Sequence, residues 1–303
     1  MLRVYFGHHK CASTWIWRIL ARVCRDAGLN HSLVLDRQTP SATGPLTDYK
    51  ATFSRSELQT YIQSVEYDLI SCITADQTQA EVLEDYRGIH VVRDPRDIVV
   101  SAYFSHRNSH PVDDLPHMAT HRERLRSVSK EEGLFLEMEF SHRELMDLST
   151  WDYDQSHILE LKMEDVTAAP YDSFLEIFSF FELLKWDAPQ RMRDKFRHIL
   201  QVGTNRLSWR HPLFAPLRSP MSVTGEQVLS AVFDNRFEKK AGGRAHGTEN
   251  KTSHYRKGVA GDWANHFTPD HVEAFKETFG EGLIAMDYEK DYDWSLPLEP
   301  SPA

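Results

Sequence analysis

The fold is decided close to the N-terminus, where residues 2–20 read LRVYFGHHKCASTWIWRIL. Leu2–Phe6 is a short apolar run that is typical of a buried parallel strand. The apolar residues that follow recur at helical spacing: Ile16, Ile19, Leu20 and Val23. We expect a helix there, with Ser13 or Thr14 as its N-cap and Gly28 as its stop. A strand, a loop and a helix in this order predict an α/β fold.

The same alternation continues along the chain. Further strands are expected at His31–Leu35, Asp68–Thr74, Gly88–Val92 and Ile158–Leu161, and further helices at Ser56–Val65, Gln77–Tyr86, Pro95–His106 and Tyr171–Leu184. Strands that alternate with helices indicate a P-loop-like α/β domain, with a central and mainly parallel sheet flanked by helices. Because no repeat or linker interrupts the pattern, we expect one domain over residues 1–294 and a disordered tail over 295–303.

Composition excludes several classes of protein. The 303 residues carry 35 Lys and Arg against 45 Asp and Glu, a formal charge of −10. Proteins that coat nucleic acid are usually basic, so this class is disfavoured. No apolar stretch is long enough to span a membrane, and three cysteines are too few for a disulfide framework. We therefore expect a cytoplasmic globular protein with no nucleic-acid or membrane partner.

The loop from Gly7 to Thr14 suits an anion. Free N–H groups and the dipole at a helix start attract negative charge, and Lys10 adds a full positive charge. A Walker-A loop would end in Gly-Lys-Ser/Thr, whereas here the lysine precedes the small residues and no glycine stands before it. ATP-kinase chemistry is therefore disfavoured. Taken alone, the segment is equally compatible with an ordinary strand–helix turn.

Two later segments also carry cations. Residues 88–106 read GIHVVRDPRDIVVSAYFSH, and Arg93 and Ser101 in it lie about two helical turns apart, where they can grip one phosphate. Residues 255–263 read YRKGVAGDW and offer two cations and a backbone donor on one loop. Each basic group alone would more simply be a surface ion pair or a solvated pair.

Together, these segments resemble the sulfotransferases that use 3′-phosphoadenosine 5′-phosphosulfate (PAPS), especially their cytosolic branch. HHKCASTW is similar to their 5′-phosphosulfate loop, usually YPKSGTTW, and RDPRDIVVS is similar to their 3′-phosphate motif. RKGVAGDW, with Asn265, Phe267 and Thr268 after it, resembles their C-terminal signature, and LELKMED at 159–165 resembles a further family region.

The resemblance implies PAPS as donor, PAP as product and no metal. It implies that Lys10 contacts the bridging oxygen and the 5′-phosphate, and that Trp15 stacks on adenine. The 5′-phosphate would be wrapped by Cys11, Ala12, Ser13 and Thr14. The 3′-phosphate would be held by Arg93, Ser101, Arg256, Lys257 and Gly258. Three positions depart from the family pattern: Ala12 replaces a glycine, Cys11 a serine or threonine, and Met163 a tyrosine.

The expected reaction is in-line attack by a hydroxyl or amine of a small molecule, for which we expect a secondary metabolite, with Lys10 stabilising the leaving oxygen. A hydroxyl acceptor also needs a general base. The family's histidine is missing, because Ile73 occupies its position in LISCITAD (69–76). Asp36, after the second strand, is the first candidate base and Asp76 the second.

Both aspartates have simpler interpretations, since Asp36 could begin a turn and Asp76 could cap a helix. His9 and His106 are weaker candidates for the base. With Phe104 they are expected to line the acceptor pocket.

The 16 histidines raise the question of a metal. The i,i+4 pairs are His106/His110 and His117/His121. No HExxH or CxxC motif accompanies them, and prolines interrupt any single helix that would carry both pairs, so no metal is expected.

Two other functions stay open: a nucleotide kinase-like phosphotransferase, and a non-catalytic protein that binds PAP or PAPS. The oligomeric state also stays open. The family's dimer motif appears here as ANHFTPDHVE (264–273), with Ala264 and Pro269 in place of its lysine and valine.

Overall fold

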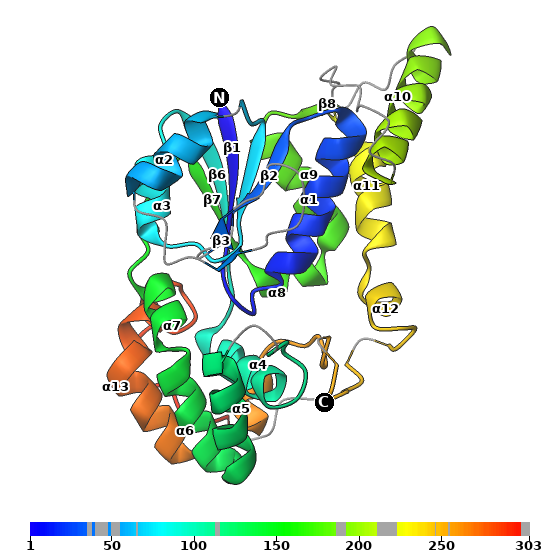
Figure 1. Ribbon diagram of the computed structural model, residues 1–303. Coiled ribbons are helices and arrows are strands. Elements are labelled where there is room, and N and C mark those ends of the chain that lie inside the picture. The colour runs from blue at the N-terminus through cyan, green and yellow to red at the C-terminus, as the bar shows by residue number, and fades with distance from the viewer. Residues whose placement is uncertain are drawn as a thin grey trace. The chain divides into compact units, whose positions relative to one another are not determined.

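The structure is a computed structural model, and it describes residues 1–34, 38–39, 48–49, 55–64, 66–112, 116–185, 192–210, 223–245, 247–253 and 255–297. The chain forms two compact units (Figure 1). Unit 1 comprises residues 1–8, 12–91 and 154–235, and unit 2 comprises residues 9–11, 92–153 and 236–303. The chain passes from one to the other inside the loop that follows the first strand.

Unit 1 contains a five-stranded sheet of order β2-β5-β1-β6-β7. The strands are β1 (Leu2–Gly7), β2 (His31–Val34), β5 (Leu69–Cys72), β6 (Tyr86–Val92) and β7 (Ile158–Lys162). β1 pairs in parallel with β5 and β6, and β2 pairs in parallel with β5. Two short pairs are β3 (Gln38–Thr39) with β4 (Asp48–Tyr49), and β8 (Leu184–Lys185) with β9 (Val223–Thr224). The predicted α/β class with a mainly parallel sheet is confirmed.

Helices flank this sheet. They are α1 (Ser13–Ala27), α2 (Arg55–Ser64), α3 (Gln77–Val82), α8 (Met163–Ala168), α9 (Pro170–Phe180), α10 (Met192–Arg210) and α11 (Gly225–Asp234). Figure 1 shows α2 and α3 on one side of the sheet and α1 and α9 on the other. The apolar stripe of α1 is buried as the spacing predicts, against apolar residues of α9 and α11. This burial fixes the helix that begins directly after the loop.

Unit 2 is helical. Its elements are α4 (Pro95–Asn108), α5 (Pro116–Ser127), α6 (Lys130–Phe140), α7 (His142–Ser149), α12 (Phe237–Lys240), the 3₁₀ helix η1 (Asp262–Asn265) and α13 (Pro269–Ala285). Aromatic and aliphatic side chains of α4, α6, α7, η1 and α13 form its core. Within the part of the chain that the structure describes, no helix combines the length and the apolar character needed to cross a membrane.

The start of α1 differs from the prediction. Neither Ser13 nor Thr14 is the N-cap; Ala12 is, in the left-handed region with φ of 54°, and no side chain caps the helix. The stop at Gly28 is confirmed, with φ of 72°. The helix expected to reach Tyr86 ends at Val82, because Tyr86 already begins β6. The helices α5, α6, α7 and α13 were not predicted.

Candidate functional site

The loop after β1 is strained where an anion would bind. Lys10 and Ala12 both have positive φ, 62° and 54°, a conformation that costs an L-residue about 1–2 kcal/mol. The carbonyl of Ala12 accepts hydrogen bonds from the backbone N–H groups of Trp15 and Ile16, so α1 begins directly after Ala12. Because no side chain caps α1, its first N–H groups are left for another acceptor.

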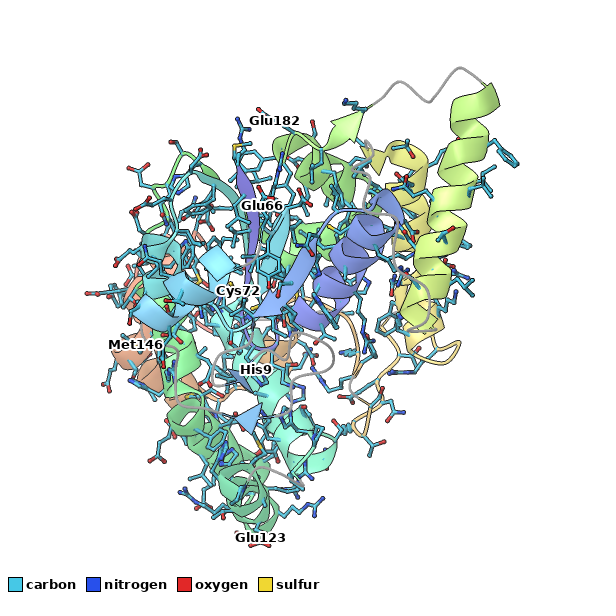
Figure 2. The ribbon with its side chains drawn as sticks, turned by 45° about the horizontal axis from the view of Figure 1, so that its top comes forward. His9, Glu66, Cys72, Glu123, Met146 and Glu182 are labelled. Atoms are coloured by element: carbon cyan, nitrogen blue, oxygen red, sulfur yellow. The ribbon has the colours of Figure 1, made fainter. Side chains whose placement is uncertain are left out.

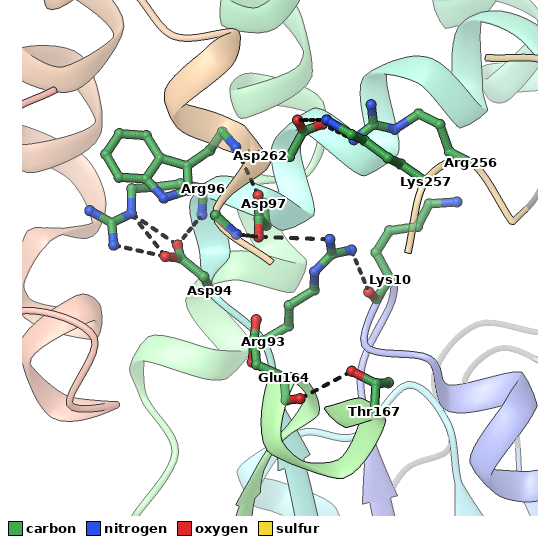
Figure 3. Close-up of polar contacts among 12 residues, drawn as sticks. Lys10, Arg93, Asp94, Arg96, Asp97, Glu164, Thr167, Arg256, Lys257 and Asp262 are labelled. Atoms are coloured by element: carbon green, nitrogen blue, oxygen red, sulfur yellow. Dashed lines mark hydrogen bonds and ion pairs between the residues drawn. The ribbon is translucent and has the colours of Figure 1, made fainter. Parts of the chain in front are cut away.

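Lys10 lies among polar groups of unit 2. Its Nζ donates to Ser105 Oγ at 2.7 Å. Its carbonyl accepts from Arg93 Nη1 at 3.2 Å (Figure 3). Burial lowers the pKa of Lys10 to about 8; the charge of Arg93 also lowers it, while Glu137 raises it. A bound anion would therefore stabilise the protonated lysine, which is the behaviour expected of a phosphate ligand.

Arg93 lies at the end of β6 and is buried. Its Nη2 is 3.8 Å from Asp97, and its buried Nε has no hydrogen-bond partner among the described residues. A buried guanidinium donor without a partner is rare, and a bound anion would satisfy it. Ser101, the other predicted 3′-phosphate ligand, is half-buried in α4.

Asp97 holds the C-terminal loop in place, a role that the sequence did not reveal. Its carboxylate accepts from the backbone N–H groups of Gly261 at 2.7 Å and Trp263 at 2.9 Å. Burial and the nearby Asp94 raise the pKa of Asp97 to about 6, against Arg93 and the two backbone hydrogen bonds. The loop that carries the predicted RKG residues is thus fixed to the first turn of α4.

Arg256 and Lys257 are held by a carboxylate rather than solvated. Lys257 Nζ donates to Asp262 at 2.9 Å, and Arg256 also donates to Asp262 (Figure 3). Arg256 donates to Glu249 as well. Although burial raises the pKa of Asp262, hydrogen bonds from His266, Lys257 and Arg256 hold it well below its usual range. Two predicted cofactor ligands are therefore positioned within unit 2 before any ligand binds.

The remaining charged residues of RDPRD build the start of α4. Asp94 caps the helix by accepting from the backbone of Arg96 at 2.9 Å. The Arg96 guanidinium lies over the rings of Trp263, at 4.0 Å, and Trp294, at 4.6 Å. These contacts join α4 to the GDW segment, so the motif is structural as well as cationic.

In unit 1, the predicted Trp15 donates its Nε1–H to the carbonyl of Asn235 at 2.8 Å and packs edge-on against Phe174. Asp76 caps α3 by accepting from the backbone of Gln79 at 2.9 Å, so its helix-cap interpretation is confirmed. Asp36, the first candidate base, lies outside the described residues.

His9 is partly exposed and begins a hydrogen-bonded chain within unit 2, which we call the His9 chain (His9 is labelled in Figure 2). His9 Nε2 lies 3.2 Å from His106 Nε2, and His106 Nδ1 lies 2.9 Å from Glu137 Oε1. His121 Nε2 lies 2.9 Å from Glu137 Oε2, and Ser141 donates to Oε1 at 2.7 Å. The elements α4, α5 and α6 thus converge on one buried carboxylate.

A similar chain lies within unit 1, which we call the His8 chain. His8 Nε2 lies 2.7 Å from His90 Nε2, and His90 Nδ1 lies 2.6 Å from Glu160. Burial and the neighbouring His90 lower the pKa of His8 well below its usual value, and burial lowers that of His90 to about 3. Both histidines are therefore neutral at physiological pH.

Sequence patterns named His9 and His106 but missed Glu137. Glu137 lies within the apolar run LFLEMEF (134–140), where a carboxylate on a buried helix face is itself a signal. His106, His121 and Glu137 offer ligand atoms within 4.8 Å of one another. His106 Nδ1, His121 Nε2 and both Glu137 oxygens take part in hydrogen bonds of the His9 chain, whereas the buried His121 Nδ1 has no hydrogen-bond partner among the described residues.

Phe104 borders a cavity of about 430 Å³ in unit 2. The other lining residues are Tyr103, Arg107, Asn108, Lys130, Lys251, Thr252, Asn265 and His266. The Phe104 ring also lies 4.7 Å from the Arg256 guanidinium. His9 and His106, predicted beside Phe104 as pocket residues, do not line this cavity.

A family model for the sulfotransferase domain matches residues 72–201 and 221–287, more than half of the chain. The chain belongs to the sulfotransferase family. This sulfotransferase is therefore an enzyme of a family that uses PAPS as its sulfuryl donor. The matched segments contain Arg93, Ser101 and Arg256–Gly258 but begin after Lys10, so the role of the loop stays a prediction.

Two solved structures resemble the sulfotransferase at low identity. A mouse sulfotransferase, SULT7A1, in complex with PAP is 14% identical, with 95% of this chain and 84% of that chain covered and a TM-score of 0.49. A retinol dehydratase in complex with androsterone and PAP is 14% identical, with 97% and 82% covered and a TM-score of 0.45. At this distance neither carries a functional argument. No curated protein sequence matches the chain.

Proposed function

We propose that this sulfotransferase moves the sulfuryl group of PAPS to a hydroxyl or amine of a small molecule by in-line displacement. The observation that carries the proposal is the set of four cations in unit 2: Lys10, Arg93, Arg256 and Lys257. All four are buried or partly buried in a protein whose net charge is −10, and three of them already contact fixed carboxylates. Cations held in this way are suited to bind a small, multiply charged anion.

Bound PAPS would supply the sulfuryl group and a phosphate leaving group. Lys10 would neutralise the charge that develops on the bridging oxygen, because among the described residues its Nζ donates to the neutral hydroxyl of Ser105 and not to a carboxylate. The backbone of residues 11–14 and the hydroxyls of Ser13 and Thr14 would hold the 5′-phosphate. Arg93, with Ser101 in α4, would hold the 3′-phosphate.

The C-terminal loop would complete the 3′-phosphate site. Arg256, Lys257 and the backbone N–H of Gly258 follow one another on a segment whose end is tied to Asp97. Gly258 has φ of 78°, where a residue with a side chain would be strained. Preorganisation of this kind reduces the entropy lost when the anion binds.

The acceptor that we propose is a neutral or cationic small molecule, such as a secondary metabolite, in the cytoplasm. The excess of acidic residues disfavours polyanionic acceptors, including glycans that already carry sulfate. Efficient sulfation of heparan-like chains would contradict this part of the proposal.

The function is tested with ³⁵S-labelled PAPS and a panel of phenols, alcohols and amines. We expect one labelled product and one PAP per turnover. The Lys10→Ala variant should lower turnover by about 10²- to 10³-fold, the usual effect of removing one group that stabilises charge in the transition state. Arg124→Ala, at an exposed position on α5, serves as the control. If no acceptor is labelled although PAP binds, the protein is a binder and not an enzyme.

Nucleotide preference separates the sulfotransferase from a kinase-like enzyme. PAP should raise the melting temperature of the wild-type protein, whereas ATP with Mg²⁺ should not. Arg93→Ala should abolish the shift caused by PAP, and Arg143→Ala on α7, an exposed arginine, should keep it. Stabilisation by ATP and Mg²⁺ alone would contradict the proposal.

A further inference from the structure

The His9 chain connects a partly exposed imidazole to a fully buried carboxylate. His9 precedes Lys10 in the loop, and Glu137 at the other end is 0% exposed. Every contact in the chain lies inside unit 2. The His9 and His106 rings are inclined by only 21° with their centroids 5.3 Å apart, as an in-plane hydrogen bond requires, and the His9 ring packs edge-on against His110. A loop imidazole is thus held from two sides beside the lysine that the proposed function uses.

The protonation of the chain follows from its hydrogen bonds. Burial raises the pKa of Glu137, but the charge of His106 and hydrogen bonds from His106, His121 and Ser141 outweigh it and hold that pKa at about 2. The ionised carboxylate therefore accepts Nδ1–H of His106. Burial lowers the pKa of His106, with smaller effects of Glu137 in the opposite direction and of Lys10 and His121 in the same one.

The neutral His106 has one lone pair left, at Nε2. It must accept Nε2–H of His9, 3.2 Å away, because two lone pairs cannot share a hydrogen bond. This fixes the tautomer of His9 and leaves Nδ1 as its basic nitrogen. A carboxylate and an imidazole that together orient a second imidazole are the arrangement that makes a histidine an effective base.

We propose that His9 is the general base of this sulfotransferase and that His106 and Glu137 position it. The inference rests on the proposed function. Nδ1 of His9 takes the proton of the acceptor O–H as the acceptor oxygen forms its bond to sulfur. The bond between sulfur and the bridging oxygen breaks, and its electron pair leaves on the phosphate of PAP, where Lys10 neutralises it. The proton later passes from the His9 imidazolium to water.

The test compares acceptors that do and do not need a base. Phenol keeps its proton at about pH 8, whereas 4-nitrophenol is largely ionised there, so only phenol needs a general base. We expect His9→Ala to lower turnover of phenol by about 10²- to 10³-fold and that of 4-nitrophenolate by less than about tenfold. Equal losses for both acceptors would overturn the proposal, because a merely structural defect does not distinguish them.

Chemical rescue provides a second readout. Added imidazole should restore phenol turnover in His9→Ala, where it can occupy the vacated space, and should not restore it in Lys10→Ala. The affinity of His9→Ala for PAP, measured by calorimetry, should stay within about threefold of the wild-type value. Absence of rescue in a variant that binds PAP normally would contradict the assignment.

The positioning residues have a milder signature. His106→Gln and Glu137→Gln should lower kcat for phenol with little change in the KM for PAPS, and should leave 4-nitrophenolate turnover nearly unchanged. ¹⁵N spectra of histidine-labelled wild-type protein should show His9 protonated at Nε2 and His106 at Nδ1. The opposite tautomers would overturn the chain as drawn, even if neither variant folds.

Two controls separate this inference from its alternatives. If the wild-type protein transfers no sulfate, the proposed function fails. If the wild-type protein transfers sulfate and His9→Ala keeps the wild-type ratio of phenol turnover to 4-nitrophenolate turnover, only the base assignment fails. If EDTA abolishes phenol turnover and Zn²⁺ restores it, His106, His121 and Glu137 bind a metal, and the proposed role of the His9 chain is overturned.

Discussion

The His8 chain and the His9 chain contain the same kinds of residue, but the buried end and the exposed end are reversed between them. Each joins a loop histidine to a second histidine through their Nε2 atoms, and each ends on a glutamate through Nδ1. In the His8 chain the first histidine is 2% exposed and the Glu160 side chain is 26% exposed. In the His9 chain the histidine is partly exposed and Glu137 is 0% exposed.

This difference decides what each chain can do. A buried imidazole with a strongly lowered pKa is a poor proton acceptor, so we expect the His8 chain to satisfy buried polar groups of unit 1 rather than to exchange protons with a substrate. A partly exposed imidazole backed by a buried anion is stabilised when it becomes protonated. Two consecutive residues thus have different roles because one belongs to the core of unit 1 and the other to the loop portion of unit 2.

The largest expected effect distinguishes the two loop histidines. His9→Gln should lower kcat with phenol by about 10²-fold or more, because glutamine keeps a hydrogen bond to His106 but cannot take a proton. His8→Gln should act mainly on stability, by about 1–3 kcal/mol, because a flexible amide replaces a ring packed in a buried site and holds the hydrogen bond to His90 less well. Steady-state kinetics and urea unfolding of both variants check this, and a larger kcat effect at His8 would reverse the assignment.

The two glutamates should differ in stability and in its pH dependence. Glu137→Gln should lower the free energy of unfolding by about 1–3 kcal/mol, and Glu160→Gln by less than about 1 kcal/mol, because only Glu137 is fully buried. The folded pKa of Glu137 is lowered from 4.5 to about 2. Its stabilisation is therefore present above about pH 4.5 and lost as the pH falls toward 2.

Acid unfolding followed by circular dichroism measures this directly. The wild-type protein should lose stability steeply between about pH 4.5 and 2, and Glu137→Gln should lose less in that window than Glu160→Gln. Identical acid profiles for the two variants would show that the buried carboxylate is not ionised in the native state.

A smaller effect concerns Lys10. Its pKa of about 8 should rise when PAP binds, because the phosphate opposes burial, the main cause of the low value. Binding at about pH 8 should therefore take up a fraction of a proton, and binding at about pH 6 almost none. Calorimetry in buffers with different ionisation enthalpies measures the uptake. Release of protons at pH 8 would contradict the placement of Lys10 at the phosphate.

The smallest effect concerns the backbone of the loop. Ala12→Gly should raise the free energy of unfolding by up to about 1 kcal/mol, since φ of 54° is unfavourable for alanine and free for glycine. Thermal unfolding measures the change. Ala21→Gly, inside α1, is the matched control and should be destabilising by about 1 kcal/mol. A destabilised Ala12→Gly would mean that the loop is not strained.

Local patterns predicted the sheet well, and the roles of the cations stay a prediction. The strand Leu2–Phe6 and the stripe of α1 follow from hydrophobic periodicity, which burial enforces wherever a sheet is covered on both faces. Arg93 and the Arg256–Gly258 segment lie in the region matched by the family model. By contrast, α5 in unit 2 has little amphipathic pattern and is surrounded by polar contacts, so periodicity gave no signal for it.

The parts of the site that escaped prediction depend on contacts between distant residues. In the sequence, nothing distinguishes Asp97 from other polar residues of a helix. Its role follows only from the hydrogen bonds that the backbone N–H groups of Gly261 and Trp263 donate to it. Glu137 lies 31 residues from the histidine that it orients. No local pattern encodes such pairs, since the free energy that selects them comes from satisfying a buried charge across elements. Asp36, predicted as the base, lies outside the described residues.

The most direct test of the division between the two chains is the pH profile of kcat/KM for phenol in wild type, His8→Gln and His9→Gln. We predict an acidic limb in wild type and His8→Gln, from protonation of the base, and its loss in His9→Gln together with a low, pH-independent rate at acid pH. An acidic limb that persists unchanged in His9→Gln would show that another group takes the proton, and would contradict the account.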